Sequence, residues 1–368
     1  MSWRVFSVST LNWADRVELD AKSFTWGRSK NHGVGGSASF VLGDPSVAET
    51  ATAENLYPGQ RALCLSWTSG DSSTLVYVGE ITDAKYDYDS RTLDVSHTDA
   101  AWSVLARRLM VGDRTQNVAK TKLTYSNIDL VTQLIRTVQV ARAGAPSSKY
   151  TLPIVVALDT PGSESRTYYG YDFMDAAEAA KAIMDAEGGP DVDFKPVWGA
   201  SGAVLWEARV GKLTGPGYEF NFKAPEPGAR GLWLQTDATE MANFVVAVGE
   251  GTEVDTLVRV ASDVATSEWP ARERVVSFKD VKSGSELQSL ANEELRQHRV
   301  PTRQAGLQML ASGKDHQVSD LVLGGTVRWY TLFDPYLSSG FRDWELVKFT
   351  GDLGDWVTLE FQQRVGAP

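Results

Sequence analysis

Two stretches far apart in the chain decide the fold, YPGQRALCLSW at residues 57–67 and LVLGGTVRWYTLF at residues 321–333. In each, a glycine turn opens a short run rich in aliphatic and aromatic residues, which is typical of a β-strand. Two further strand-like runs follow each stretch, VYVGEIT and RTLDVS in the first case and WELVKFT and DWVTLEF in the second. The chain therefore repeats a three-stranded pattern.

The spacing within the two copies favours a duplicated β-domain. The second run ends with an apolar residue 22 positions after Gly59 and 24 positions after Gly325, and a threonine follows it in both copies. In this alignment Leu63 and Trp329 each stand four residues after their glycine, and both are expected to point into the interior of a small β-barrel. The alternative is that unrelated three-stranded meanders look alike at this level.

Composition limits the class of protein. The 368 residues are 42% hydrophobic and 23% charged, which is the balance of a globular chain with two or three domains. Lysine and arginine number 36 against 47 aspartates and glutamates, so the net charge is −11. A general nucleic-acid binder needs a basic face. Specific DNA binding is therefore not expected.

Cysteine usage and hydropathy exclude further classes. Cys64 is the only cysteine, so no disulfide can form within the chain and a cysteine-based zinc site is excluded. The N-terminal sequence MSWRVFSVSTLNW lacks the pattern of an export signal, and no run of about 18 apolar residues occurs. We expect no stable membrane insertion.

The first hundred residues are predicted to form a small barrel or sandwich of five strands. The predicted strands are residues 3–9, 37–43, 61–67, 74–82 and 92–97.

Helical periodicity follows from residue 98 onward. The first predicted helix has Thr98 as its N-cap, an apolar side of Trp102, Leu105 and Leu109, and Gly112 as its stop. The second has Asn127 as its N-cap and an inward face of Ile128, Val131, Leu134, Ile135 and Val138. The third has an inward face of Phe173, Ala176, Ala177, Ala180, Ile183 and Met184 and ends at Gly188.

Strands resume after this mixed region. Residues 243–251 and 255–263 are predicted to form a hairpin, and Ser283 and Glu286 have the spacing of a capping box at the start of a helix. Three closing strands are predicted at residues 326–333, 344–350 and 356–363.

The fold class expected is α+β and β-rich, with two similar small β-barrels separated by a mixed α/β domain. The predicted domains are 1–105 for the first barrel, 106–235 for the α/β domain, 236–275 together with 315–368 for the second barrel, and 276–314 for a helical insertion into it.

Catalytic patterns are sparse. The four histidines, His32, His97, His298 and His316, form no HExxH arrangement, and neither a GxSxG elbow nor a phosphate-binding GxxxxGK[ST] loop occurs. We predict no catalytic residue, no cofactor-binding residue, no metal ligand and no cofactor.

Two stretches resemble ligand-binding motifs. GVGGSA at residues 33–38 fits a dinucleotide fingerprint, but polar residues precede it and a β-rich run follows, so a glycine-rich turn between two strands is predicted. DAKYDYDS at residues 83–90 concentrates carboxylates, but it lacks the glycine and glutamate of a calcium loop, so an acidic hairpin is predicted.

The order of barrel, α/β domain, second barrel and inserted helix, with KNHGVGGSASFVLG, LYPGQRALCLSW and LVLGGTVRWY, resembles the tail hub proteins of bacteriophages. It looks most like the minor tail proteins of long-tailed phages that infect actinobacteria, and it is similar to the baseplate hub proteins of contractile tails. The resemblance implies a non-enzymatic homotrimer whose six similar barrels form a ring with six-fold pseudo-symmetry.

That ring would join a hexameric tail to a three-fold tip at the distal end of the virion tail, after synthesis in the host bacterial cytoplasm. The implied partners are the distal tail protein ring, the tape measure protein and other minor tail and tip or fibre proteins. DNA would only pass through. Two alternatives remain, a tail-associated cell-wall hydrolase, which would need a cleft with paired carboxylates, and a carbohydrate-binding tail-tip protein, which would expose some of its 12 tryptophans.

Overall fold

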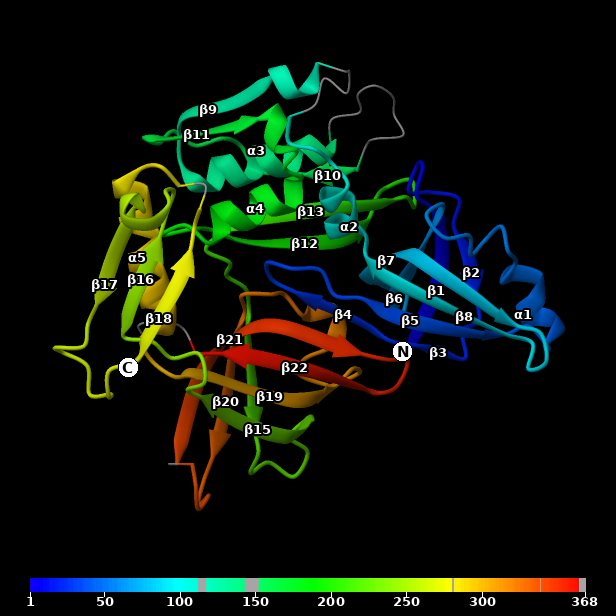
Figure 1. Cartoon of the computed structure of the whole chain (residues 1–368). Coiled ribbons are helices and arrows are strands. Elements are labelled where there is room, and N and C mark those ends of the chain that lie inside the picture. Colours follow the sequence, from blue (N-terminus) through cyan, green and yellow to red (C-terminus); the bar gives the residue numbers. More distant parts are fainter. Residues whose placement is uncertain (112–116, 143–151, 280, 338, 364–368) are drawn as a thin grey trace.

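The computed structural model of the chain describes residues 1–111, 117–142, 152–279, 281–337 and 339–363. Figure 1 shows four parts: a sheet from the N-terminal residues at the right, a second sheet at the bottom, an α/β unit at the top and a small sheet with one helix at the left. The fold is β-rich and of the α+β class, as predicted.

The N-terminal sheet has seven strands in the order β2-β1-β6-β7-β8-β5-β3. Its strands are β1 (Ser2–Ser9), β2 (Val17–Leu19), β3 (Ser23–Phe24), β5 (Gly36–Val41), β6 (Arg61–Ser69), β7 (Ser72–Asp87) and β8 (Thr92–Asp99). A short helix, α1 (Pro45–Thr50), crosses from β5 toward β6.

The C-terminal sheet has six strands in the order β14-β20-β21-β22-β19-β15, and a seventh, β4 (Trp26–Ser29), pairs with β21. The six are β14 (Gly217–Asn221), β15 (Ala229–Asp237), β19 (Thr302–Leu310), β20 (Thr326–Thr331), β21 (Gly340–Gly351) and β22 (Trp356–Gln362). A 3₁₀ turn, η5 (Val318–Asp320), lies between β19 and β20.

The two sheets repeat one strand order, which supports the predicted duplication. Strands β1, β6, β7, β8, β5 and β3 follow one another in the first sheet as β14, β20, β21, β22, β19 and β15 do in the second, and the matching strands also occur in the same order along the chain. The exception is at one edge: β1 is antiparallel to β6, whereas β14 is parallel to β20.

The alignment of the copies differs from the one predicted. An extra residue interrupts the pairing of the long strand with its successor in both sheets, between Ile81 and Asp83 in β7 and between Leu346 and Lys348 in β21. Aligning these bulges matches Ile81 with Leu346 instead of with Phe349.

The strand pairing shows that the same shift applies to the neighbouring strands β6 and β20. Glu80 pairs with Ala62 and Glu345 pairs with Thr326, so Trp329 corresponds to Leu65 instead of Leu63. Both Leu63 and Trp329 are nevertheless fully buried, as predicted.

The turn glycines are also shifted from the prediction. The amide of Gly59 donates to the carbonyl of Ile81, and the amide of Gly324, not Gly325, donates to that of Leu346. Gly59 and Gly324 both have positive φ, 73° and 81°, which favours glycine. The turn is one residue shorter in the second copy, and an ungapped comparison of the two sequences hides this.

The strands predicted at 243–263 do not belong to the second barrel. They form a separate sheet of order β17-β16-β18, from β16 (Phe244–Val248), β17 (Val258–Ser262) and β18 (Glu273–Ser277), with η4 (Glu253–Asp255) and helix α5 (Gly284–His298). Ser283 caps α5 by accepting from the amide of Glu286, which is one half of the capping box that the sequence spacing predicted. This unit is inserted between β15 and β19, and β14 and β15 supply the strands that the prediction took from it. Local patterns look alike in both segments, so only the pairing distinguishes them.

The α/β unit has two small sheets, β10-β13-β12 and β11-β9, packed with three helices. Its elements are α2 (Ala100–Ala106), η1 (Val118–Lys120), β9 (Lys122–Ile128), α3 (Leu130–Arg142), β10 (Ile154–Val155), β11 (Glu164–Tyr169), η3 (Gly170–Asp172), α4 (Ala176–Met184), β12 (Asp191–Trp198) and β13 (Val204–Gly211).

The helix starts lie later than predicted. Asp99, not Thr98, caps α2 by accepting from the amide of Trp102, and the predicted stop at Gly112 lies outside the described residues. Asn127 and Ile128 belong to strand β9, and Asp129 accepts from the amide of Thr132 at the start of α3.

The third helix is also shorter than predicted. A capping box of Asp175 and Glu178 begins α4, so Phe173 precedes the helix and is 57% exposed. In all three helices an aspartate, Asp99, Asp129 or Asp175, accepts a free amide of the first turn, which sets the start of the helix more closely than the helical period alone indicates.

The two large sheets share one apolar core. Buried side chains of the N-terminal sheet, such as Phe40 and Leu63, lie in the same cluster as Trp329, Phe349 and Phe361 of the C-terminal sheet. The opposite face of the N-terminal sheet packs on the helices of the α/β unit in a second cluster. No helix in the described part of the chain is long and apolar enough to cross a membrane.

Candidate functional site: the junction of the two sheets

The junction is built by strand β4, which leaves the N-terminal sheet and pairs with β21 of the C-terminal sheet. The pairing is antiparallel and joins Trp26 with Gly351 and Ser29 with Lys348. Gly27 allows the close approach, since a Cβ there would lie 2.8 Å from a methyl group of Thr350. The chain therefore uses one of its own strands to cover the edge of its second copy.

Indole donors hold the β21–β22 turn against the N-terminal sheet. Trp26 Nε1 donates to the carbonyl oxygen of Asp352 at 3.1 Å, and Trp3 Nε1 donates to that of Gly354 at 2.9 Å. Trp3 also packs edge-to-face on Trp67, with ring centroids 4.7 Å apart. These contacts satisfy two carbonyls of the turn while burying aromatic surface.

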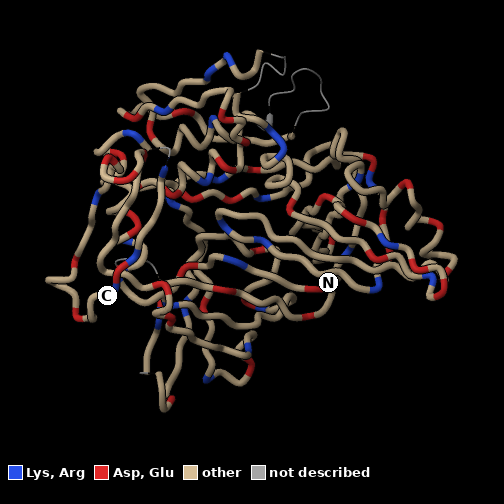
Figure 2. The backbone as a smooth tube through the Cα atoms, viewed as in Figure 1, with Lys and Arg blue, Asp and Glu red and all other residues tan. Residues whose placement is uncertain are grey.

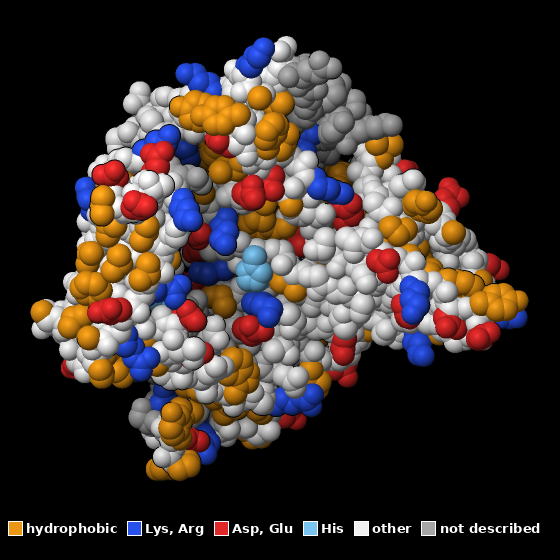
Figure 3. All heavy atoms as spheres, viewed as in Figure 1, with side chains coloured by type: hydrophobic (Ala, Val, Ile, Leu, Met, Phe, Trp, Pro, Cys, Tyr) orange, Lys and Arg blue, Asp and Glu red, His pale blue; other side chains and the backbone are white. Residues whose placement is uncertain are grey.

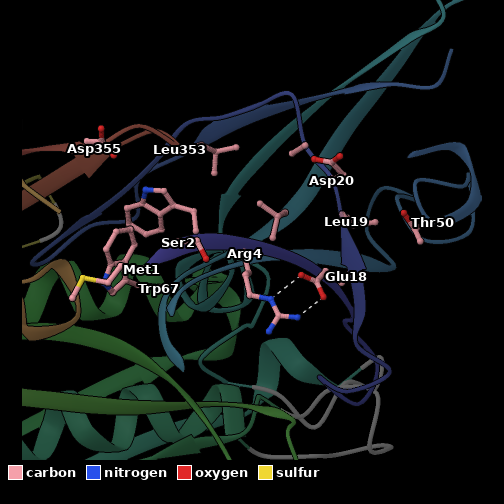
Figure 4. A pocket seen from close by; sticks show the side chains of 13 residues that line it. Met1, Ser2, Arg4, Glu18, Leu19, Asp20, Thr50, Trp67, Leu353 and Asp355 are labelled. Atoms are coloured by element: carbon pink, nitrogen blue, oxygen red, sulfur yellow. Dashed lines mark hydrogen bonds and ion pairs between the residues drawn. The ribbon is translucent and has the colours of Figure 1, made fainter. Parts of the chain in front are cut away.

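A pocket of about 580 Å³ remains beside this turn. Figure 4 shows Leu353 and Asp355 of the turn near Trp67 and Met1, with Arg4 paired to Glu18 on the far side. The turn thus reaches into a hollow of the N-terminal sheet without filling it.

Buried charges join the same segment to the α/β unit. Arg28 donates to Asp193 at 2.7 Å, Arg209 reaches the other carboxylate oxygen at 3.1 Å, and the side chains of Arg28 and Asp193 are only 6% and 2% exposed. Lys30 pairs with both Asp191 and Glu345. A buried pair is costly to break because one partner then remains charged without compensation. Residues 26–31 therefore lock three parts of the chain together.

Asp99 lies within the electrostatic reach of this network. Burial raises the pKa of Asp99 to about 6, a shift that Asp193 reinforces and that Arg28 and two backbone amides oppose. The rise reflects chiefly the energetic cost of taking the charged carboxylate out of water, and the nearby charge of Asp193 is a small addition.

A larger cleft of about 1140 Å³ lies where the α/β unit, helix α5 and the C-terminal sheet meet. Figure 3 shows it as a hollow with basic and acidic side chains and one histidine at its rim. His32 and His298 both line it, whereas His97 and His316 lie elsewhere.

The carboxylates of the cleft have structural partners. Asp191 and Glu345 bind Lys30, Glu293 binds Arg296 and Gln297, and Asp175 caps α4. Burial raises the pKa of Asp185, which also lines the cleft, with the charges of Glu294 and Glu293 as smaller causes and Lys181 opposing the rise. Asp175, Asp191, Glu293 and Glu345 thus hold the fold together, and Asp185 is the carboxylate of the cleft that a test for the paired acid and base of glycoside hydrolysis should address.

The two stretches that resemble ligand-binding motifs, residues 33–38 and 83–90, lie at a connection between strands and in a hairpin, as predicted. Residues 33–35 end the connection between β4 and β5, and residues 36–38 begin β5. A Cβ at Gly36 would lie 2.0 Å from the carbonyl oxygen of Thr25, so close strand contact explains this glycine. Residues 83–90 lie in the β7–β8 hairpin, where Asp87 accepts from the amide of Ser90. Among the described residues no group of three histidine, cysteine or acidic side chains is placed to hold a metal.

Most tryptophans considered for sugar binding are in cores. Trp67, Trp206, Trp329 and Trp344 are buried, and Trp102 and Trp356 are partly buried. Exposed tryptophans do occur at Trp233 and Trp269, on the outer strand β15 and in the inserted unit.

Sequence reasoning missed the junction because β4 is too short to show a strand period. The signal available in TWGRS, residues 25–29, was weak, a single tryptophan and an arginine among mostly polar residues. Its partner Asp193 lies 165 residues away, a distance over which sequence alone shows no pairing.

The fold of this chain was compared with those of known proteins. No family model matches the chain, and no curated protein matches it by sequence. By structure it is similar to a 43 kDa tail protein of prophage MuSo2 from Shewanella oneidensis, at 10% identity over 98% of both chains with a TM-score of 0.61.

Two further solved structures are similar. A tail protein from Neisseria meningitidis MC58 matches at 13% identity, over 99% of this chain and 97% of that one, with a TM-score of 0.57. A chain of the Francisella PdpA-VgrG complex matches at 6% identity, over 100% of this chain and 58% of that one, with a TM-score of 0.53. The chain therefore has the fold of phage tail proteins over nearly its whole length.

Proposed function

We propose that this protein is a non-enzymatic structural hub at the distal end of a phage tail. In this proposal three copies form a ring around a passage for DNA, and the ring joins the six-fold tail to the three-fold tip. The sequence resemblance directs the proposal to long-tailed phages of actinobacteria, and the fold shared with two tail proteins supports a tail component.

The observation that carries the proposal is the repeat of one strand order in two sheets of a single chain. A trimer can present six similar contacts to a six-fold ring only if each chain offers two similar surfaces. The two sheets, joined edge to edge by β4 and β21, are such a pair.

The partners proposed are the distal tail protein ring and the tape measure protein on the tail side, and minor tail and tip or fibre proteins on the other. The charge distribution suits a channel wall that does not hold phosphates. Figure 2 shows acidic and basic residues interspersed along all parts of the chain, and the net charge is −11. This mixture of acidic and basic residues does not form a strong basic stripe, which would retain DNA.

The copy number in the assembled particle tests the proposal. Imaging of the tail should place three copies around its axis, with the two sheets of each chain at nearly the same radius. One, two or six copies, or a position off the axis, would contradict it. A monomer in dilute solution would not, because assembly can require the neighbouring tail proteins.

The hydrolase alternative predicts a different result. Purified protein incubated with peptidoglycan should release no soluble fragments if the cleft carboxylates serve only the fold. Release that is lost on replacing Asp185 by Asn would favour the enzyme.

A further inference from the structure

The junction described above has an open counterpart elsewhere in the molecule. Within the chain, the end of the β21–β22 hairpin is received by the N-terminal sheet: β4 covers its edge at Lys348–Gly351, and Trp3 and Trp26 bind its turn. The repeat implies an equivalent hairpin in the first sheet and an equivalent receiving surface in the second.

The equivalent hairpin is the β7–β8 arm, residues 82–92. By the alignment of the bulges, Asp83 to Tyr86 correspond to Lys348 to Gly351. In this stretch β7 pairs with β8 alone, because its pairing with β6 ends at Glu80. Among the described strands, none covers the edge that β4 covers in the other copy. The arm also exposes two tyrosines, Tyr86 at 48% and Tyr88 at 81%.

The equivalent receiving surface is a groove of about 830 Å³ on the C-terminal sheet, called here the β15 groove. It is lined by Leu234 and Thr236 of β15, by Arg303 and Arg342, and by Tyr336 and Phe341. Strand β15 ends the strand order of its sheet, so its outer edge is free within the described structure. In the first copy of the repeat, the chain segment that corresponds to this part of β15 forms strand β4.

Aromatic residues mark the same end of both sheets. Trp67, which helps to receive the hairpin within the chain, corresponds to Thr331 at the end of β20. Beyond Thr331 the connection to β21 exposes Phe333 at 86% and Tyr336 at 85%, and Phe341 at the start of β21 is 56% exposed. Such a concentration of exposed aromatic side chains is uncommon on a surface that stays in water.

The arm and the groove cannot meet within one molecule. Figure 1 shows the β7–β8 hairpin beside α1 at the right end, whereas the β20–β21 connection projects at the bottom. We propose that the β7–β8 arm of one copy binds the β15 groove of a second copy, head to tail, with the free edge of β7 pairing with the free edge of β15. A contact between two different surfaces of identical chains closes into a ring when its rotation closes. The inference rests on the proposed hub function and specifies its subunit contact.

The arm and the β15 groove carry charges of opposite sign. The arm carries Asp83, Asp87 and Asp89 against two basic residues. The groove carries three arginines, Arg303, Arg328 and Arg342, and one carboxylate, Asp343, which pairs with Arg328. Strand addition supplies backbone hydrogen bonds, and the exposed tyrosines of the arm supply the apolar contact with the aromatic residues of the groove.

Cysteine cross-linking of the full chain tests the contact. Cys64, the natural cysteine, is buried, and burial raises its pKa, so it contributes little background. Single variants Tyr88→Cys and Tyr336→Cys are mixed at high concentration in a thiol–disulfide buffer. A disulfide-linked pair of chains should form about tenfold or more faster than in the control mixture of Tyr57→Cys with Tyr336→Cys, because a docked arm raises the effective concentration of the two thiols.

Tyr57 is a matched control because it is an exposed tyrosine, at 54%, outside the arm. Equal rates in the two mixtures would overturn the proposed contact. The double variant Tyr88→Cys, Tyr336→Cys then counts the copies in the closed species. Three linked chains agree with the hub. Efficient linking into a closed species of another number of chains would support the contact and contradict the proposed trimer. Three copies on the tail without the cross-link would support the trimer and contradict the contact.

Discussion

Trp26 Nε1 donates to the carbonyl oxygen of Asp352 at 3.1 Å, so a residue of the N-terminal part of the chain caps the β21–β22 turn, 326 positions further along the chain. Strand pairing beside it extends from Trp26–Gly351 to Ser29–Lys348. This hydrogen bond and this short ladder, together with the apolar core that the two sheets share, hold the two copies in one relative placement. Any ring built from them depends on this rigidity.

Replacing Trp26 by Ala should destabilise the chain strongly. The side chain is 2% exposed and packs on Trp3 and Phe349, so truncation removes both the buried aromatic surface and the turn hydrogen bond. The expected cost is about 3–5 kcal/mol of unfolding free energy. Urea unfolding measures it, and Trp269→Ala, at a residue that is 46% exposed, is the control that should stay within about 0.5 kcal/mol of the wild type.

Removing Asp193 should leave Arg28 buried without its main partner. Asp193→Ala is expected to cost about 3–5 kcal/mol, because the guanidinium is taken out of water and loses its counterion. The matched control is Asp159→Ala, which breaks the exposed pair with Arg136 and should cost no more than about 1 kcal/mol. Equal losses in the two variants would show that the junction network does not stabilise the fold.

Gly36 should not tolerate a methyl group. A Cβ at this position would lie 2.0 Å from the carbonyl oxygen of Thr25, which belongs to backbone that cannot move without separating β3 from β5. We expect Gly36→Ala to cost about 1–3 kcal/mol or more. At Gly43 the added carbon would make only ordinary contacts near 3.9 Å, so Gly43→Ala should stay within about 1 kcal/mol. A thermal melt of both variants compares them directly.

His97 should make the stability depend on pH. It lies inside the N-terminal sheet, where its Nδ1 is 3.0 Å from the hydroxyl of Tyr77, and burial lowers its pKa from 6.5 to about 4. Between these values the unfolded chain binds a proton that the native chain does not. Stability from this residue is therefore complete above pH 6.5 and is lost as the pH falls toward 4, by an amount on the order of 3 kcal/mol.

The check is the difference between wild type and His97→Gln, which keeps a polar side chain near Tyr77. Their unfolding free energies should converge as the pH falls from 7 to 4. Asp99 has a pKa raised to about 6 and gives the opposite slope in part of this range, but it is common to both proteins and drops out of the difference. A constant difference across the range would contradict the assignment to His97.

The sequence by itself determined the repeat. Glycine turns and short apolar runs recur after Gly59 and before Thr326, and these local signals set where strands β6 to β8 and β20 to β22 form. Helix α5 was also readable, since Ser283 and Glu286 act within one turn of each other. Such features depend on neighbours a few residues apart, which is the range over which a sequence pattern acts.

Tertiary structure alone decided which strands belong together. The inserted strands at 244–262 are short and apolar like the barrel strands, and hydrogen bonding across the chain is what separates the two groups. Because the turn before β20 is one residue shorter than the turn before β6, Trp329 corresponds to Leu65 instead of Leu63. Strand β4, with Arg28 and Trp26, finds partners more than 160 residues away, because burial of charge and aromatic surface at the junction outweighs the weak local preference of four residues for any one sheet.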